Sequence, residues 1–217
     1  MLASPSYGNI CLETVFLSPT SHSLKPSSNI TEIEKKYLIQ DHHKNYLTPI
    51  FKSYFMNWGQ LIRDIKTKGD IVTQGFLNAD LHADISNKFG FTKIDFTPTE
   101  VRIIKVIRTQ KNNKIDYIYS AKGPGTYSRR ETEYYISEQQ YKELWDLTAG
   151  RRVHRLRLNI DVITPHGEKE VSLDYYLDRK LFIAEVEFKT ENEGKIFHDL
   201  GRDVTEISFY KNANLAN

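Results

Sequence analysis

The sequence predicts an α+β protein built around an antiparallel β-barrel, with a charged interior and helices packed outside. Charged and apolar residues alternate in two acidic segments that lie far apart in the chain, residues 32–36 and 185–187. Because successive side chains of a strand point to opposite faces, each segment places its carboxylates on one face. Hairpin-like connections indicate antiparallel neighbours. The glycine-rich phosphate loops of P-loop and Rossmann folds are absent from the sequence.

Charged residues also alternate in the segments between these two. The charged positions are Glu100, Arg102, Lys122, Arg129, Glu131, Glu133, Arg155, Arg157 and Asp174. Such alternation is ordinary on antiparallel strands that have one face in solvent. Here the carboxylate pairs lie toward both ends of the chain and most cations lie between them. This distribution favours a barrel whose charged faces turn inward and whose apolar faces are covered by helices.

A charged lumen predicts a ligand of complementary charge. Isolated ions are costly to desolvate, so inward charges require a wet lumen and partners. Neighbouring carboxylates repel unless a cation lies between them, and Mg²⁺ prefers carboxylate oxygens. Polyphosphate oxygens accept both metal ions and guanidinium groups. The pattern therefore indicates a polyphosphate site that uses a divalent metal.

The barrel strands are expected from residue 30 onward, in segments that are rich in apolar and β-branched residues. They are residues 31–40, 71–77, 100–109, 116–122, 129–136, 153–164, 168–176 and 181–188. Polar residues 110–114 and the Pro-His-Gly segment 165–167 read as hairpin loops. These connections are too antiparallel for a doubly wound sheet.

Three helices are expected, two between strands and one after the last strand. Residues 54–65 carry apolar side chains at helical spacing and end near Gly69, a helix-stop signal. The second helix begins at Ser137, which forms a capping-box pattern with Gln140, and Gly150 stands at its C-terminal cap. A short third helix is expected at residues 193–200.

Composition describes one globular domain at residues 30–217, preceded by a flexible Ser- and Pro-rich leader at residues 1–29. The formal net charge of +2 predicts no broad attraction to nucleic acid or an anionic membrane. The single cysteine permits no internal disulfide, which indicates a reducing compartment, the cytoplasm. No apolar run approaches the roughly 20 residues needed to cross a bilayer, and no signal peptide is recognised. A homodimer is compatible with these features.

An ordered series of motifs resembles the CYTH domain, the family of triphosphate tunnel metalloenzymes. The series comprises Glu32-x-Glu34-x-Lys36, residues 73–77, 101–103 and 122–125, Arg129-x-Glu131-x-Glu133, and residues 174–176, 184–188, 200–205 and 212–215. It covers residues 31–215. The resemblance implies an eight-stranded antiparallel barrel that forms a tunnel, with helices outside. It also implies hydrolysis or cyclisation of a triphosphate with Mg²⁺ or Mn²⁺.

The resemblance also implies roles for individual residues. The metal-binding carboxylates would be Glu32, Glu34, Asp174, Glu185 and Glu187. The phosphate ligands would be Lys36, Arg102, Lys122, Arg129, Arg155 and Arg157. Glu131 and Glu133 would hold or activate water, with Lys122 as the third catalytic residue. Arg152 is the alternative to Arg155 and Arg157, because the match around residues 151–157 is loose.

One position departs from the family pattern. The family often has Arg-x-Arg after the second motif, whereas here Arg102 is followed by Ile104. Either one phosphate ligand is missing or a nearby cation replaces it, with Lys105, Arg108 and Arg130 as the candidates.

The expected function is hydrolysis of inorganic tripolyphosphate, a small molecule, to pyrophosphate and phosphate. The alternatives are a class IV-type adenylyl cyclase, whose His-x-Arg-type motif is not found at the matching place, and a thiamine triphosphatase. The non-enzyme alternative is a module that binds polyphosphate or nucleotide without catalysis. Five carboxylates argue against it, because binding an anion alone gains nothing from them.

Overall fold

The computed structural model describes residues 26–216 except 42–43, 46–47, 56 and 199. Most of the expected leader therefore lies outside the described residues, and its last residues, Ser28 and Asn29, already belong to the first strand. Among the described residues, no helix is both long and apolar enough to span a bilayer.

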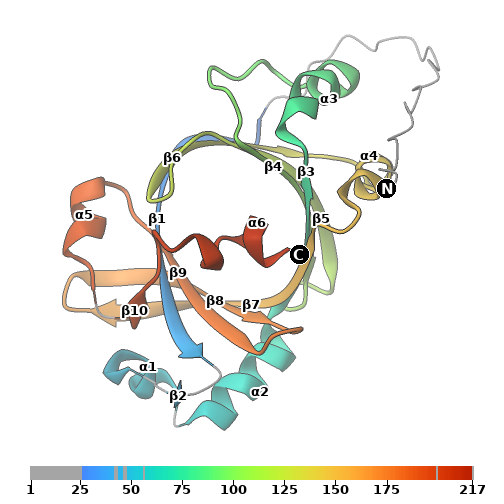
Figure 1. Cartoon of the computed structure of the whole chain (residues 1–217). Helices are drawn as coiled ribbons and strands as arrows, with labels where there is room; N and C mark the ends of the chain where they lie inside the picture. The colour runs from blue at the N-terminus through green and yellow to red at the C-terminus, as the bar shows by residue number, and fades with distance from the viewer. Residues whose placement is uncertain (1–25, 42–43, 46–47, 56, 199, 217) are drawn as a thin grey trace, which may run out of the picture.

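Eight long antiparallel strands close into a barrel, as predicted (Figure 1). They are β1 (Ser28–Asp41), β3 (Asp70–Leu77), β4 (Glu100–Arg108), β5 (Lys114–Lys122), β6 (Ser128–Tyr135), β7 (Arg152–Thr164), β8 (Gly167–Tyr176) and β9 (Leu181–Glu187). Around the barrel the order is β1-β6-β5-β4-β3-β7-β8-β9, and pairing of β9 with β1 closes it. The two-residue strands β2 (Lys44–Asn45) and β10 (Arg202–Asp203) each pair with β1.

The strand periodicity separates a charged lumen from an apolar exterior. On β1, Ile33 and Tyr37 belong to an apolar cluster outside the barrel, whereas Glu34 and Lys36 line the cavity inside it. Successive side chains of a strand alternate between the two faces of the barrel wall. A one-residue slip in register would therefore turn the apolar side chains into the lumen and the charged side chains toward the helices outside, so the register is fixed. The predicted charged interior is confirmed.

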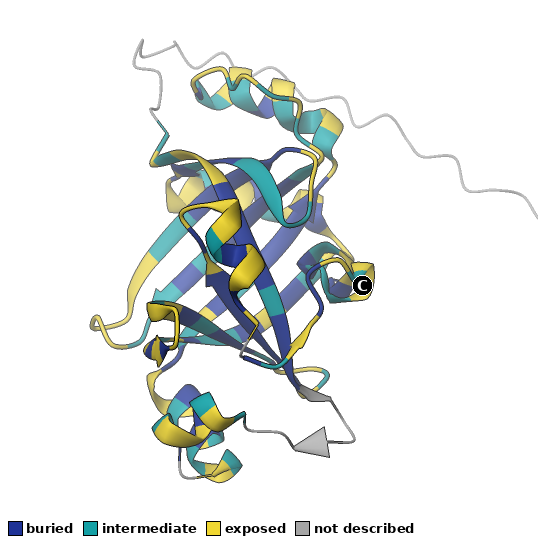
Figure 2. Cartoon of the chain, turned by 90° about the vertical axis from the view of Figure 1, so that its left-hand side faces the viewer, coloured by how far each residue is buried: buried dark blue, intermediate teal, exposed yellow. Residues whose placement is uncertain are grey.

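Two groups of helices cover the barrel exterior. Helices α1 (Pro49–Tyr54) and α2 (Trp58–Lys68) pack on one side through Phe51, Leu61 and Ile65. Helices α3 (His82–Phe89) and α4 (Glu138–Trp145) cover another side. Figure 2 shows the mostly buried barrel wall beside helices that expose one face to solvent.

The helix boundaries follow the capping residues. In α4 the Ser137 hydroxyl accepts a hydrogen bond from the Gln140 backbone N–H at 3.1 Å, and the Gln140 side chain accepts one from the Ser137 N–H at 2.8 Å. The capping box is therefore as predicted. The helix ends earlier than expected, at Trp145, and a 3₁₀ turn, η2 (Asp146–Thr148), leads to Gly150 with φ of 76°. In α2 the Asn57 side chain caps the N-terminus, so the helix begins at Trp58.

Several short elements escaped the sequence analysis. They are α1, η1 (Ala79–Leu81), α3, η3 (Ser208–Tyr210) and α6 (Asn212–Leu215). Helix α5 spans Glu191–Ile196 instead of residues 193–200 because Thr190 caps it through the Glu193 backbone N–H. Elements of four to eight residues show too few apolar repeats for a helical period to be recognised.

The C-terminal segment closes one end of the barrel. Helix α6 lies across the barrel in the axial view of Figure 1. Leu215 and Ala216 pack with Leu38, Phe76 and Tyr176 in one buried apolar cluster. The Tyr176 hydroxyl also donates a hydrogen bond of 2.6 Å to the side chain of Asn212 in α6. The lumen is therefore plugged at this end.

Replacing Gly75 by alanine should destabilise the barrel by about 1–3 kcal/mol, the usual cost of overpacking. A Cβ at Gly75 would lie 2.7 Å from Thr148 Oγ1 and 2.8 Å from Thr148 Cβ. Thr148 cannot withdraw easily, because it is fully buried and its hydroxyl is bonded to Trp145 and Arg152. Urea denaturation measures the effect. The control is Gly59→Ala in α2, whose Cβ meets only side-chain ends and which should not destabilise the protein, because alanine is the better helix former by about 0.5–1 kcal/mol.

Candidate active site

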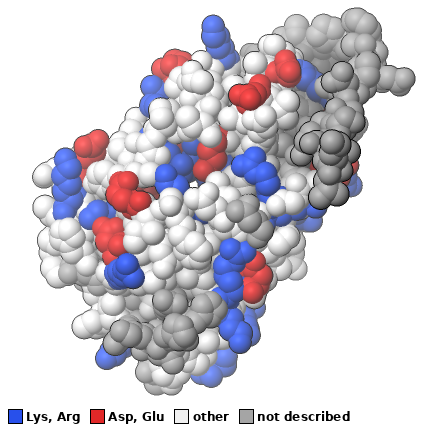
Figure 3. Space-filling view, viewed as in Figure 1, with Lys and Arg blue, Asp and Glu red and all other residues white. Residues whose placement is uncertain are grey.

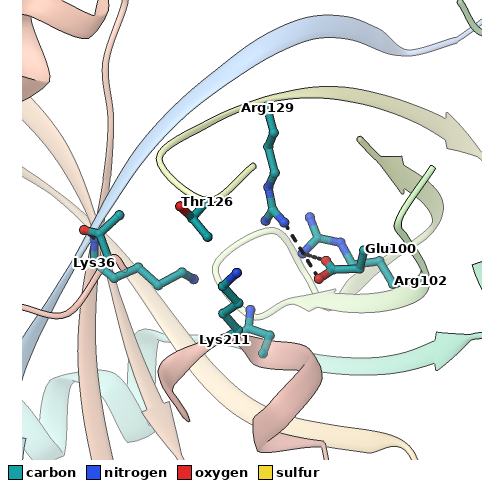
Figure 4. Close-up of a pocket in the computed structure, with 8 residues that line it drawn as sticks. Lys36, Glu100, Arg102, Thr126, Arg129 and Lys211 are labelled. Carbon is teal, nitrogen blue, oxygen red and sulfur yellow. Dashed lines mark hydrogen bonds and ion pairs between the residues drawn. The ribbon is translucent and has the colours of Figure 1, made fainter. Parts of the chain in front are cut away.

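The barrel encloses a cavity of about 310 Å³ that contains most of the predicted site residues. Its charged lining comprises Glu32, Glu34, Lys36, Arg102, Arg108, Lys122, Arg129, Glu131, Glu133, Arg155, Arg157, Glu185 and Glu187. A smaller pocket of about 20 Å³ lies toward α6, where Lys36 and Lys211 extend toward the same space as Arg129 (Figure 4). In the axial space-filling view, basic and acidic side chains lie side by side near the centre of this end (Figure 3).

Three carboxylates form a cluster at the seam between β1 and β9. One oxygen from each of Glu32, Glu34 and Glu187 lies within 4.8 Å of the others. The seam creates this proximity, because Glu34 and Glu187 are directly paired in the β1–β9 register. Burial and the neighbouring Glu185 raise the pKa of Glu34. Partial burial and the charges of Glu34 and Glu32 raise the pKa of Glu187 to about 7.

The cluster fits a hard divalent cation. Carboxylate oxygens are the preferred ligands of such ions. Burial and the neighbouring carboxylates raise the pKa values of Glu34 and Glu187, even though Lys36 Nζ lies 3.2 Å from Glu34. Within the described residues, no hydrogen bond or ion pair engages the Glu187 carboxylate. A bound cation would remove the repulsion that favours protonation.

The other two predicted metal ligands, Asp174 and Glu185, are not among these three clustered carboxylates and pair with basic side chains instead. Asp174 is fully buried and accepts a two-fold hydrogen bond from Arg157, with Nε–Oδ1 and Nη2–Oδ2 distances of 2.7 and 2.6 Å. Arg155 Nε lies 2.9 Å from Asp174 Oδ2. Glu185 pairs with Lys36 and Arg157, and burial of its charge is outweighed by these cations, so its pKa is well below the usual range. Both carboxylates thus hold basic side chains in place.

A second group of cations lies on β4, β5 and β6. Lys122 is 1% exposed, and its Nζ lies 2.5 Å from Glu32 and 3.1 Å from Glu131. Arg129 Nε lies 3.2 Å from Glu32, and Arg102 Nη2 lies 2.9 Å from Glu131. Buried cations of this kind are stable only with partners. The network therefore orients the cations toward the lumen before any ligand arrives.

The two predicted catalytic glutamates differ in their surroundings. Glu131 accepts hydrogen bonds from Ser120 at 2.7 Å and from Arg102 at 2.9 Å. Burial disfavours its charge, but Lys122, Arg102 and Ser120 outweigh burial and lower its pKa to about 2. Burial and the adjacent Glu131 instead raise the pKa of Glu133. Glu131 is therefore a fixed anion, and Glu133 is the better proton acceptor.

Of the remaining sequence candidates, which are Lys105, Arg108, Arg130 and Arg152, only Arg108 lines the cavity. Arg152 hydrogen-bonds Thr148 and the Trp145 carbonyl and stacks over the Trp145 ring at 4.2 Å. Arg130 pairs with Asp95 on the exterior. At the far end of β4, Arg108 is held by Asp70 and Asp116 at 3.0 and 3.1 Å. Lys105 alternates with the lumen-facing residues of β4 and does not line the cavity. None of them takes the place of a cation at Ile104.

Sequence analysis missed uncharged residues that contact this network. Gln74 is fully buried, and its Oε1 accepts a hydrogen bond of 2.7 Å from Arg155. Its Nε2 has no hydrogen-bond partner in the described part of the chain. Asn212 from α6 lines both cavities. Both residues lie in motifs of the predicted family. They were missed because the candidates were chosen by charge, and an amide side chain carries none.

Comparison with known proteins identifies relatives of the chain. A scan against protein-family models gave no match. The chain is 30% identical over 146 residues to an inorganic triphosphatase from Nitrosomonas europaea, an alignment that covers 65% of this chain and 89% of that protein. A solved inorganic triphosphatase is 25% identical, with a TM-score of 0.44 and coverage of 85% of this chain and 97% of that chain. The PH1819 protein from Pyrococcus horikoshii is 15% identical, with a TM-score of 0.42 and coverage of 75% and 81%.

The raised pKa of Glu187 predicts a pH-dependent loss of stability when cations are removed by a chelator. The folded protein binds a proton at Glu187 up to about pH 7, whereas the unfolded chain releases it near the ordinary value of 4.5. Stability should therefore fall as pH rises between these values. Glu187→Gln cannot titrate, so its loss over this window should be smaller.

Thermal unfolding of both proteins in chelator between pH 4.5 and 8 measures the difference. Glu168→Gln, an exposed change at the β7–β8 hairpin, is the control and should behave as the wild type. If the unfolding temperatures of the wild type and Glu187→Gln fall equally with pH, Glu187 is not the group with the raised pKa.

Proposed function

Because this chain belongs to the CYTH family of triphosphate tunnel metalloenzymes, we propose that it hydrolyses inorganic tripolyphosphate to pyrophosphate and phosphate. The observation that carries the proposal is the arrangement of charge in the lumen. A carboxylate cluster with raised pKa values lies beside buried arginine and lysine side chains in one enclosed cavity. The similarity to the Nitrosomonas inorganic triphosphatase supports this choice of substrate.

We assign Glu32, Glu34 and Glu187 as the residues that would hold Mg²⁺ or Mn²⁺. Their oxygens are close enough to share one ion. When bound, such an ion supplies positive charge to phosphate oxygens as a Lewis acid. Asp174 and Glu185 would act through the basic residues that they hold, Arg155, Arg157 and Lys36. They would thereby fix the positions of the phosphate ligands.

The basic residues would bind the three phosphates. Arginine offers paired N–H donors that match phosphate oxygens, and lysine acts as a compact charge. Arg102, Lys122 and Arg129 on one side and Lys36, Arg155 and Arg157 on the other are already ordered by carboxylates. Ordering before binding reduces the entropy lost when the substrate is held. Phosphate oxygens would share these cations with the carboxylates.

Hydrolysis requires a water to attack the terminal phosphorus in line with the departing pyrophosphate oxygen. Glu133 would accept a proton from this water, because its raised pKa makes it a stronger base than Glu131. As the bond between the phosphorus and the bridging oxygen breaks, negative charge grows on pyrophosphate. Lys122 and the arginines would stabilise this charge, at about 3–4 kcal/mol for an essential donor.

Purified protein with Mg²⁺ or Mn²⁺ should convert tripolyphosphate to equal amounts of phosphate and pyrophosphate, as followed by phosphorus NMR. Glu34→Gln removes one carboxylate of the cluster, so metal-dependent turnover should fall at least about 100-fold while the barrel stays folded. Glu168→Gln is again the control. Undiminished turnover by Glu34→Gln at saturating metal would refute the metal assignment, and cyclic AMP formed from ATP would instead indicate a cyclase.

The distinction between the two catalytic glutamates can be tested by the pH dependence of kcat. Glu133→Gln should lower kcat by about 10²–10⁴, the usual contribution of a general base, and remove the acid limb of the profile. Glu131→Gln should leave the acid limb in place and raise KM, because Arg102 and Lys122 lose their shared anchor. An unchanged acid limb in Glu133→Gln would exclude it as the base.

A further inference from the structure

The small pocket near α6, which we call the α6 pocket, has a strongly positive lining. Its described lining holds one carboxylate, Glu100, and four cations, which are Lys36, Arg102, Arg129 and Lys211. The large cavity, by contrast, is lined by seven cations and six carboxylates among the described residues. Burial disfavours the charge of Glu100, but Arg102 and Arg129 outweigh burial and lower its pKa. The α6 pocket is therefore suited to an anion.

Lys211 has no carboxylate partner among the described residues. Lys36, by contrast, pairs with both Glu185 and Glu34. In the described part of the chain the Nζ of Lys211 has neither a hydrogen bond nor an ion pair, although the side chain is partly buried and lines the pocket. Figure 4 shows the amine of Lys211 extending toward the amine of Lys36. Two ammonium groups repel each other, so an anion between them would stabilise this arrangement.

The chain on both sides of Lys211 is anchored to the barrel. Before it, the Thr205 hydroxyl accepts a hydrogen bond of 3.0 Å from the backbone N–H of Lys36 in β1. After it, the Asn212 side chain accepts the hydrogen bond from the Tyr176 hydroxyl. The backbone of Lys211 is therefore held beside the pocket, while its long side chain can adjust to a ligand.

The α6 pocket adjoins the large cavity, and its size admits a single small group. The two cavities share four lining residues, which are Lys36, Arg102, Arg129 and Asn212. One water molecule needs a cavity of roughly 10–15 Å³, and the α6 pocket has about 20 Å³. A phosphate chain in the large cavity can therefore place its end in the α6 pocket, but no more of its length.

The end of a phosphate chain suits this positive pocket better than the interior of a chain does. A terminal phosphate carries about −1.5 to −2 charges near neutral pH. An internal phosphate has only one ionisable oxygen and carries less charge. A lysine ammonium binds phosphate as a compact charge with rotatable donors, so it can follow the oxygens of a terminal group.

We propose that the α6 pocket binds the terminal phosphate of the substrate and that Lys211 donates hydrogen bonds to its oxygens. The inference rests on the proposed function and adds to it a binding residue and the recognition of a chain end. Lys36 and Arg129 would contact the same phosphate from the barrel wall. The segment that precedes α6 thereby contributes directly to substrate binding.

Binding calorimetry in chelator, where no metal supports turnover, tests the inference with two probes that have the same number of phosphates. Linear tripolyphosphate has chain ends, and cyclic trimetaphosphate has none. The wild type should bind the linear chain at least about tenfold more tightly than the ring. Lys211→Met removes the charge and keeps the length of the side chain. It should weaken binding of the linear chain at least about tenfold and binding of the ring no more than about threefold.

Matched variants separate the charge of Lys211 from its packing. Lys211→Arg keeps the charge and should bind the linear chain within about threefold of the wild type. Lys211→Gln is a second neutral variant and should weaken that binding as Lys211→Met does. Lys195→Met removes an exposed lysine of α5, outside the lumen, and should behave as the wild type. With Mg²⁺, Lys211→Met should also raise KM for tripolyphosphate at least about tenfold. Circular dichroism checks that each variant is folded.

The outcomes separate this inference from the proposed function. Binding of the linear chain without hydrolysis in Mg²⁺, lost in Lys211→Met, would refute the proposed function and support the chain-end site. Hydrolysis with Kd and KM unchanged in folded Lys211→Met and Lys211→Gln would overturn the inference alone. Equal weakening of both probes would show that Lys211 supplies only general positive charge, and would also overturn it. A wild type that neither binds nor hydrolyses tripolyphosphate would overturn both.

Discussion

Closure of the barrel by pairing β1 with β9 places charged side chains where bulk water cannot fully solvate them. The register at this seam sets Glu34 directly beside Glu187. Every inward cation then needs a carboxylate, and the structure supplies one for each of Lys36, Lys122 and Arg157. Because an unpaired buried charge is costly, other arrangements of these charged side chains are disfavoured. The repulsion left at the seam is what a bound cation would relieve.

Much of this architecture was predictable from local patterns. Alternation along residues 32–36 and 185–187 indicated an inward charged face, and the Ser137–Gln140 capping box located the start of α4. The sequence could not predict which acidic residues form the carboxylate cluster and which pair with basic side chains, because this depends on which strands are neighbours. Asp174 pairs with arginines only because β7 lies beside β8. The family resemblance treats the five carboxylates alike, and their ion pairs distinguish them.

The apolar cluster around Ile104 and the packing of α6 were hidden from the sequence for a different reason. Ile104 looked like the loss of one cation, but its neighbours in space come from separate strands, and only the strand order brings Val72 and Ile118 next to it. Helix α6 has four residues and no repeat that periodicity can reveal. Its position depends on apolar packing against Tyr176 and other residues at the barrel end.

Helix α6 covers one end of the lumen through its apolar cluster. If the other end serves both for entry of the reactant and for exit of the two fragments, each turnover ends with the fragments leaving along the route of entry. A fragment still inside would obstruct the next molecule, and we expect pyrophosphate to act as a competitive inhibitor. Release, more than bond cleavage, would then govern flux when the fragments accumulate.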